Sequence, residues 1–426
     1  MNIVIIGYGP GGASAAIAAR MFDSKADIKI ITEEIDEAHR KPGASLALEF
    51  PDTDLLDIKD WSFDVLSKKR IKVLPGTSVV RINPDNKVID IKGPQGTSEI
   101  DYDRLILATG GIPNLPTILG IDLPGVFTIQ TMSDTTKIGK LLSGMESIAI
   151  VGAGFSGLET AERLLELGKE THLIIRSRLM RRQLEAPMSK ELLSRLPENL
   201  IIHQGEEPSK VLGSSKVEGL VLAGKNHKID AVIFMTGVKP NVKLAAQIGL
   251  KIGELGGIII NEKMETSQND IYAIGDCVEM VDPLTDKQLL LPVGSVAARA
   301  GRQAGVAAVG GSKIYSDTAT RLQYDRIFGT DIVCIGHSST TAKNVGVKTS
   351  VLFIEDPHEF TKVALVTNEE GVLIGGQVLA SRLGARLGFE ILDRVESSAI
   401  LKEKPLSKPR HERLQEYIEQ TFGPIR

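Results

Sequence analysis

Short apolar runs rich in β-branched residues recur along the chain and are separated by longer helical stretches. The runs are residues 3–6, 27–31, 148–151, 171–175 and 271–274, and their length and composition predict buried strands. The first and third are each followed by glycines and then by a stretch rich in alanine, leucine or glutamate, which predicts a helix. This alternation is typical of parallel sheets. The pattern therefore predicts an α/β fold class with two Rossmann-like units.

Two glycine-rich turns connect these strands to their helices and match the dinucleotide-binding pattern GxGxxG. In such a turn the first glycine permits a tight bend, the second lets the backbone approach a pyrophosphate, and the third lets helix and strand pack closely. Amides at the helix N-terminus then hold the anion. The pair predicts two bound dinucleotides, FAD and a nicotinamide nucleotide, on these residues: Gly7, Gly9, Pro10, Gly11 and Gly12 in the first turn, and Gly152, Gly154 and Gly157 in the second.

Three further segments are expected to complete the first site. Glu33 follows the second strand, where a carboxylate can accept a hydrogen bond from an adenine ribose, although an exposed acid at a strand end would look the same. A strand near residues 102–111 ends in the small residues Ala108, Thr109 and Gly110, and another near 271–274 ends in Gly275-Asp276. We expect these strand ends to be separate halves of one site.

Composition limits the remaining possibilities. A chain of 426 residues is expected to form two or three domains. A net charge of −4 with only 4% aromatic residues gives no sign of a nucleic-acid partner. The chain shows neither a positively charged leader nor an apolar run of about 18 residues, so we expect a cytoplasmic protein without a membrane span.

The order of these motifs resembles the two-dinucleotide flavoprotein disulfide reductase superfamily, and the likeness covers nearly the whole chain. Residues 291–297 and 328–337 look like the branch of NADH oxidases and coenzyme A-disulfide reductases. The resemblance implies an FAD domain at 1–115 and 245–320, an NAD(P)H domain at 116–244, and a C-terminal α+β dimerisation domain at 321–426. It also implies a homodimer.

The resemblance further implies roles for single residues. Asp276 would bind the flavin ribityl chain, and Val293 and Gly237 belong to cofactor-binding motifs. Phe155 would shield the flavin until nicotinamide displaces it, although an ordinary core aromatic would look identical. Glu159 would pair with Lys41 near flavin N5 and stabilise the reduced flavin, with a solvated lysine as the alternative.

The chain departs from this family at its redox centre. Where the branch carries a redox cysteine, the sequence reads His39-Arg40-Lys41-Pro42-Gly43, and Pro42 occupies the cysteine position. Disulfide and persulfide exchange require a thiolate. The two cysteines of the chain, Cys277 and Cys334, are better interpreted as buried structural residues because neither has an evident cationic setting.

The second site carries a signal for nucleotide preference. The strand at 171–175 ends without an acid and continues into Arg176, Arg178 and Arg181. Guanidinium groups suit a 2′-phosphate, whereas an acid would bind a ribose hydroxyl. We therefore expect NADPH to be accepted. Use of both NADPH and NADH stays open, as does a solvated basic turn without discrimination.

Metal binding is not expected, because the seven histidines show no pair at the short spacing typical of metal ligands and the cysteines form no CxxC. The sequence thus predicts an FAD-dependent NAD(P)H oxidoreductase that passes electrons to a small-molecule acceptor such as oxygen, with hydrogen peroxide as product. A reductase for a small redox protein of the rubredoxin or ferredoxin type, or for a quinone, is the enzymatic alternative. A flavin-binding regulatory or assembly subunit without turnover is the alternative of another class.

Overall fold

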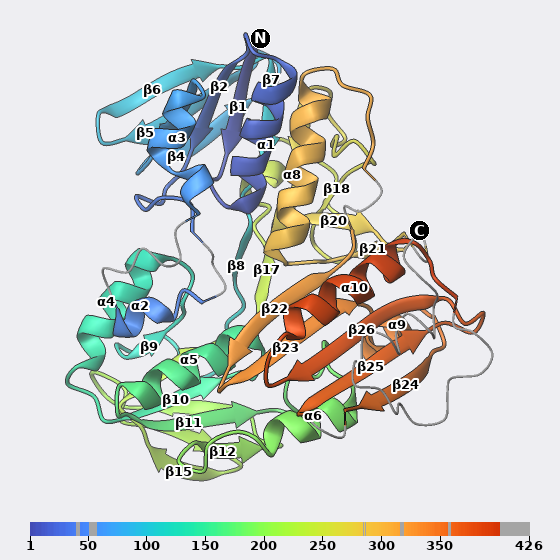
Figure 1. Ribbon diagram of the computed structural model, residues 1–426. Helices are drawn as coiled ribbons and strands as arrows, with labels where there is room; N and C mark the ends of the chain where they lie inside the picture. Colours follow the sequence, from blue (N-terminus) through green and yellow to red (C-terminus); the bar gives the residue numbers. More distant parts are fainter. Residues whose placement is uncertain are drawn as a thin grey trace. The chain divides into compact units, whose positions relative to one another are not determined.

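The computed structural model describes residues 1–39, 43–50, 58–283, 285, 287–315, 319–356 and 359–400. These residues form two compact units, each containing a parallel sheet (Figure 1). The first unit contains Met1–Asn114, Ile129–Lys140 and Gly237–Ala319, and the second contains Leu115–Thr128, Leu141–Thr236 and the chain from Thr320 onward. The predicted α/β class is confirmed. The division into three functional domains stays a prediction.

The parallel sheet of the first unit has the strand order β19-β7-β1-β2-β3. Its central strands are buried on both faces, as Ile3, Val4 and Ile5 show with 0% exposure, and this explains the continuous apolar runs in the sequence. The strands are β1 (Asn2–Ile6), β2 (Asp27–Ile31), β3 (Ile71–Leu74), β7 (Arg104–Leu107) and β19 (Ile271–Ala273).

Two small-residue helices, α1 (Pro10–Phe22) and α8 (Gly294–Ala308), pack side by side in this unit (Figure 1). Their backbones approach closely, because a Cβ added at Gly305 would lie 2.2 Å from the Ala15 carbonyl oxygen. The alanine and glycine content of both helices is therefore a packing requirement. This contact places the N-terminus of α8 next to that of α1, with an added Cβ at Gly294 lying 3.6 Å from Pro10.

Smaller elements complete the first unit. An antiparallel sheet contains β4 (Ser78–Asn83), β5 (Val88–Gly93) and β6 (Gly96–Asp101). The strands β8 (Gly111–Pro113) and β17 (Val238–Pro240) form an antiparallel pair, and β18 (Ile258–Ile259), β20 (Val278–Val281) and β21 (Gln288–Leu289) form a third small sheet. The remaining helices are α2 (Leu46–Glu49), η1 (Lys59–Trp61), α3 (Phe63–Lys68), α4 (Met132–Leu142), α7 (Lys243–Gln247) and η2 (Gly275–Cys277).

The second unit repeats the parallel arrangement with the order β12-β11-β10-β16-β9. An antiparallel sheet covers one face of it, and Ile174 and Leu220 lie in the core between the two layers. The elements are β9 (Val126–Phe127), β10 (Ser147–Val151), α5 (Phe155–Glu166), β11 (Glu170–Ile175), α6 (Ala186–Leu193), β12 (Ile201–Gln204), β13 (Pro208–Leu212), β14 (Gly219–Leu222), β15 (Lys225–Lys228) and β16 (Ala231–Phe234).

The same unit contains a five-stranded antiparallel sheet near the C-terminus, in the order β22-β23-β26-β25-β24. Helix α10 packs on it, since Ile391 belongs to the same core as Val333 and Val378. The elements are β22 (Leu322–Ile327), β23 (Thr330–Gly336), α9 (Ser339–Asn344), β24 (Ser350–Glu355), β25 (Thr361–Thr367), β26 (Leu373–Ala380) and α10 (Gly384–Glu396). Among the described residues, none of the helices has the length and apolar character to cross a membrane.

Candidate functional site

The first glycine turn combines two crowded positions with one open position. An added Cβ at Gly7 would lie 2.1 Å from the Ala108 carbonyl oxygen, and one at Gly12 would lie 2.0 Å from that of Gly7. A Cβ at Gly9 would meet nothing within 4 Å. Gly9 is also the N-cap of α1 and has no side-chain capping bond. The space at Gly9 and the amides of the first turn fit a pyrophosphate.

The strand order brings the other predicted FAD-binding segments to the same edge of the sheet. β7 lies beside β1 and β19 lies beside β7, all three running parallel, so residues 108–110 and Asp276 follow strand ends at one edge. The Thr109 hydroxyl donates a hydrogen bond of 2.7 Å to the Asn241 carbonyl oxygen. Val293 caps α8, whose N-terminus lies next to Pro10. The expectation that separate segments meet at one site therefore has a geometric basis.

Two other predicted residues border this edge. Glu33 lies two residues beyond β2, and its side chain is exposed, as a contact to a bound ribose requires. Gly237 lies immediately before β17 with φ of +92°, which favours glycine. The carbonyl oxygen of Gly237 accepts a 2.9 Å hydrogen bond from the Asn114 amide, next to the antiparallel pair of β8 and β17.

The second glycine turn has the same geometry. A Cβ at Gly152 would lie 2.3 Å from the Met235 carbonyl oxygen, and one at Gly157 would lie 2.0 Å from that of Gly152. A Cβ at Gly154, the N-cap of α5, would meet nothing within 4 Å. The second turn therefore leaves the same open approach to a helix N-terminus as the first.

The predicted catalytic residues divide between described and undescribed parts of the chain. Phe155 and Glu159 lie on the first turns of α5 and are 9% and 6% exposed. Lys41, the predicted partner of Glu159, and Pro42, the residue at the cysteine position, lie outside the described residues. The proposed ion pair and the proline substitution at the flavin therefore stay predictions.

The three predicted arginines differ in their surroundings. Arg178 donates to the backbone carbonyl oxygens of Leu184 and Arg181 and, at 3.2 Å, to the Thr340 hydroxyl. The guanidinium of Arg178 is thus bonded within the protein, and the predicted role of this segment in binding a 2′-phosphate stays a prediction. Burial lowers the pKa of Arg181, and the neighbouring cations, Arg176 first, lower it further. Such mutual repulsion favours binding of an anion.

The segment after β11 is anchored to the start of α9 and to β26 in the same unit. Buried Glu185 accepts hydrogen bonds from the Ser339 amide at 2.7 Å and from the Gln377 side chain at 3.2 Å. The Ser338 hydroxyl donates to the Arg182 carbonyl oxygen at 2.6 Å. The arginine-bearing loop is therefore fixed by residues far from it in sequence.

Both cysteines are structural in their setting, as expected. Cys277 and Cys334 are free thiols, 0% and 2% exposed. Burial raises the pKa of Cys277, and it raises the pKa of Cys334 to about 12. One detail of the expectation was wrong, because Arg321 supplies a positive charge near Cys334 that lowers its pKa. Burial has the larger effect, so neither thiol forms a thiolate readily.

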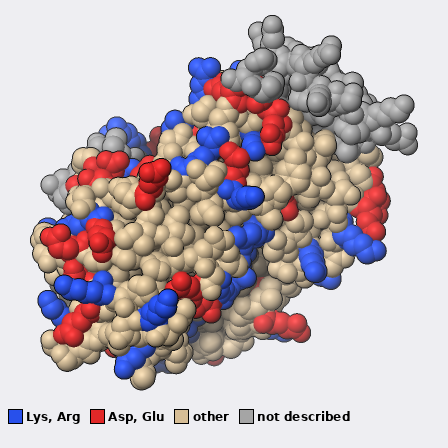
Figure 2. All heavy atoms as spheres, turned by 90° about the horizontal axis from the view of Figure 1, so that it is seen from below, with Lys and Arg blue, Asp and Glu red and all other residues tan. Residues whose placement is uncertain are grey.

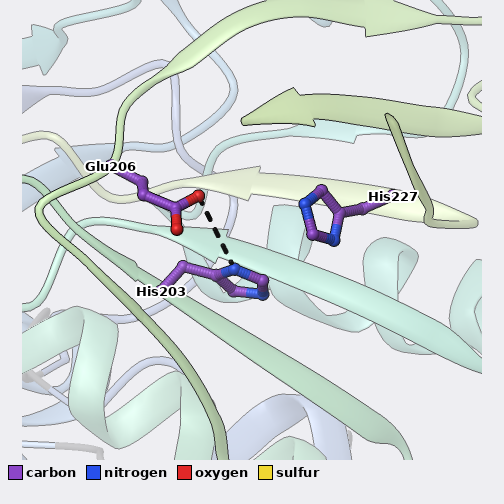
Figure 3. Close-up of side chains that lie close together, drawn as sticks. All are labelled: His203, Glu206 and His227. Atoms are coloured by element: carbon purple, nitrogen blue, oxygen red, sulfur yellow. Dashed lines mark ion pairs between the residues drawn. The ribbon is translucent and has the colours of Figure 1, made fainter. Parts of the chain in front are cut away.

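Two histidines that are far apart in the sequence lie close together in the structure, which their sequence spacing did not suggest. His203, Glu206 and His227 each offer a ligand atom, and these atoms lie within 4.8 Å of one another (Figure 3). Burial lowers the pKa of His203, and the neighbouring imidazoles of His172 and His227 lower it further. The spacing of the histidines in the sequence could not reveal this group, because His203 and His227 come from separate strands.

Charged side chains of both signs are intermingled on the face drawn in Figure 2. The Lys and Arg side chains of the described residues lie there among Asp and Glu, consistent with a net charge of −4. Nucleic-acid binding depends on a concentrated basic surface. Figure 2 therefore gives no support for such a partner.

Comparison with known proteins agrees with this geometry. Residues 1–304 match the family described as pyridine nucleotide-disulphide oxidoreductase. The chain is 30% identical to an NADH oxidase of Methanocaldococcus jannaschii, covering 96% of this chain and 92% of that protein. It is 29% identical to a CoA-dependent NAD(P)H sulfur oxidoreductase of Pyrococcus abyssi, covering 94% and 90%. An NAD-dependent persulfide reductase from A. fulgidus superposes with a TM-score of 0.85 at 28% identity, covering 93% and 77%.

These matches confirm the predicted class, an oxidoreductase that uses FAD and NAD(P)H. The two glycine turns account for that class physically, because each supplies an open anion-binding helix terminus. The chain belongs to the pyridine nucleotide-disulphide oxidoreductase family.

Proposed function

We propose that this protein oxidises NAD(P)H through bound FAD and delivers the electrons to an external small acceptor without a redox cysteine. The burial of both cysteines is the observation that carries this proposal. A chain whose two thiols are buried, with pKa values raised by that burial, lacks the accessible thiolate that disulfide or persulfide exchange requires. Relatives with sulfur substrates therefore indicate ancestry rather than the acceptor.

The protein's contribution is to bind and orient the two cofactors. Gly9 and the strand-end segments around Thr109 and Asp276 would hold FAD, and Gly154 with Arg176 would hold the nicotinamide nucleotide. FAD, when bound, supplies the hydride-accepting and electron-transferring chemistry. Phe155 would shield the flavin, and Glu159 with Lys41 would stabilise its reduced form by fixed charge.

Oxygen is the acceptor that we favour, with hydrogen peroxide as product. Two electrons and two protons convert O₂ to H₂O₂, and one NAD(P)H with one proton supplies them. Reduction of the peroxide to water would require a further two electrons, which by the family resemblance some relatives deliver with the help of a cysteine at the position that Pro42 occupies here. The stoichiometry of one peroxide per NAD(P)H is therefore the expected signature.

The decisive experiment is anaerobic stopped-flow mixing of the FAD-loaded protein with NADPH and then with NADH. Rapid loss of the oxidised-flavin absorbance is expected with at least one nucleotide. Oxygen is then admitted and peroxide is measured. Fast flavin reduction followed by slow reaction with oxygen would move the assignment to a quinone or a small redox protein, which an acceptor screen identifies. Flavin reduction far slower than any plausible turnover would contradict the enzymatic proposal and favour a binding role.

A further inference from the structure

Three side chains from different segments of the second unit converge at the edge of its parallel sheet (Figure 3). His203 lies on β12, Glu206 lies in the segment that follows, and His227 lies on β15. The Nδ1 atom of His203 is 3.8 Å from Oε2 of Glu206. The rings of His203 and His227 meet edge to face, with their centroids 4.9 Å apart.

Strand register explains this convergence. His203 pairs with Ile174 on β11, and Ile174 lies in the core between the parallel and antiparallel layers. His227 pairs with Leu220 on β14, which lies in the same core. Paired residues share a face of their sheet, so the two imidazoles approach each other from opposite layers. Gly205, with φ of +82°, turns the chain between His203 and Glu206.

A hydrogen-bond chain behind His203 gives a second, independent indication of a ligand. Oε1 of Glu170 is 3.1 Å from Nε2 of His172, and Nδ1 of His172 is 2.9 Å from Nε2 of His203. An ionised carboxylate only accepts, so His172 donates from Nε2, and its Nδ1 in the neutral ring accepts a hydrogen bond from Nε2 of His203. The Nδ1 lone pair of His203 then points toward the Glu206 carboxylate.

This arrangement places two electron-pair donors opposite each other at a distance suited to a shared cation. Ligand atoms bound to tetrahedral Zn²⁺ at about 2.0 to 2.2 Å lie roughly 3.3 to 3.6 Å apart, close to the 3.8 Å between Nδ1 of His203 and Oε2 of Glu206. His227 offers a ring nitrogen within 4.8 Å of a ligand atom of each of the other two residues, so it can serve as the third ligand. A metal-binding histidine usually donates its other ring nitrogen to a carboxylate, a backbone carbonyl or water. Here His172 takes that place, and Glu170 supports His172 in turn.

We propose that His203, Glu206 and His227 bind a divalent transition-metal ion of the Zn²⁺ class. Two imidazole nitrogens and one carboxylate oxygen suit zinc and its neighbours, whereas Mg²⁺ and Ca²⁺ prefer oxygen ligands alone. Three protein ligands leave one position for water. The ion would connect β12 to β15 and thereby hold the two layers of the unit together.

The test is isothermal titration of the untagged, FAD-loaded protein with Zn²⁺ after treatment with a chelator, together with thermal unfolding in the presence of Zn²⁺. We expect one Zn²⁺ per chain and a rise in Tm that depends on Zn²⁺ concentration. Glu206→Gln and His227→Gln should each weaken binding at least about tenfold. His172→Gln should weaken it by roughly tenfold to a hundredfold, because it removes the support behind His203.

Two controls separate a lost ligand from a lost fold. His337→Gln removes a histidine of the same unit outside this group and should leave Zn²⁺ affinity unchanged. Glu206→Gln and His227→Gln should unfold without metal at the temperature of the unaltered protein, since both side chains lie at a partly exposed edge. The proposal would be overturned if the protein bound no stoichiometric Zn²⁺, or if Glu206→Gln and His227→Gln bound Zn²⁺ as tightly as the unaltered protein. Displacement of Zn²⁺ by an equal concentration of Mg²⁺ would also overturn it.

Discussion

Arg176 already has a carboxylate partner, because its Nε lies 3.1 Å from Oε1 of Glu207 and both side chains are more than half exposed. Removing this competitor by Glu207→Gln should strengthen binding of a 2′-phosphate. An exposed ion pair contributes about 0.2 to 1 kcal/mol, so we expect the NADPH to NADH ratio of kcat/KM to rise by up to about fivefold.

Arg176→Glu should lower the NADPH to NADH ratio of kcat/KM by tenfold or more, roughly the effect of losing a charge-assisted hydrogen bond.

Steady-state kinetics with both nucleotides provides the measurement, and Glu218→Gln serves as a control that removes an exposed carboxylate elsewhere in the unit. An unchanged ratio in Arg176→Glu would refute the assignment of the 2′-phosphate site.

Cys277 and Cys334 offer a direct test of chemistry without a thiol. The double variant Cys277→Ala, Cys334→Ala removes every cysteine of the chain. Because both thiols are buried with raised pKa values, we expect NAD(P)H oxidation per bound flavin to stay within about twofold of the unaltered protein. Turnover is measured together with flavin content, so that a loss of stability is not mistaken for a loss of chemistry. Collapse of flavin-normalised turnover would show that a cysteine takes part.

Inference from single residues agrees with the local geometry where neighbours in the sequence determine it, and was incomplete where distant segments contribute. The glycines of both turns have the crowded and open positions that the pattern predicts. The surroundings of Arg178 could not be foreseen, because its partner Thr340 is far away in the sequence. The same holds for the approach of His227 to His203, which depends on strand register and on how two layers stack.

At the scale of elements, two glycines in the turn between β1 and α1 have different roles. Gly12 allows the helix to pack against the strand, and Gly9 leaves space for the cofactor. Gly12→Ala would place a methyl group 2.0 Å from the Gly7 carbonyl oxygen, and such overpacking costs about 1 to 3 kcal/mol. We expect a lower Tm of the protein without FAD. Gly9→Ala meets open space at an ordinary φ of −76°, so Tm without FAD should stay within about 2 °C while FAD affinity falls. Equal destabilisation by both substitutions would contradict this division of roles.

The start of β10 is held by Asp230, whose carboxylate accepts hydrogen bonds from the Ser147 and Glu146 amides at 3.1 and 2.9 Å. These bonds lower the pKa of Asp230, with Ser147 the larger cause. Its stabilisation is therefore present above the unfolded-state pKa of about 3.9 and is lost as pH falls through the folded-state value. Asp230→Asn should lower the free energy of unfolding by about 1 kcal/mol at pH 7 and by less at pH 3, as measured by urea unfolding. If the difference in free energy of unfolding between Asp230→Asn and the unaltered protein were the same at pH 7 and pH 3, this role of Asp230 would be contradicted.

Strand positions followed closely from the sequence. The run at 27–31 corresponds to β2 (Asp27–Ile31), and the run at 148–151 lacks only the first residue of β10 (Ser147–Val151). Both strands are largely buried on their two faces, so a continuous run of β-branched residues is enough to predict their positions. The antiparallel layer of β13, β14 and β15 was not predicted, because its short strands contain polar residues such as Asn226 and Lys228. Its position is determined by the core that it covers.

For the whole molecule, the predicted homodimer stays to be tested. The C-terminal sheet with α10 forms a distinct core that includes Val333 and Ile391, in the region that the family resemblance assigns to dimerisation. We expect light scattering coupled to size-exclusion chromatography to give twice the mass of one chain at micromolar concentration. A mass equal to one chain under those conditions would contradict the expectation and remove the role assigned to this sheet.

The hydrogen bonds from α9 and β26 to the loop after β11 bear on any attempt to change the nucleotide preference through that loop. Glu185 and the Arg182 carbonyl oxygen bind Ser339, Gln377 and Ser338, which lie more than a hundred positions later. A loop transplanted from a relative would therefore arrive without its anchors. An engineered exchange of the nucleotide preference would therefore have to transfer the loop and the segments that anchor it together.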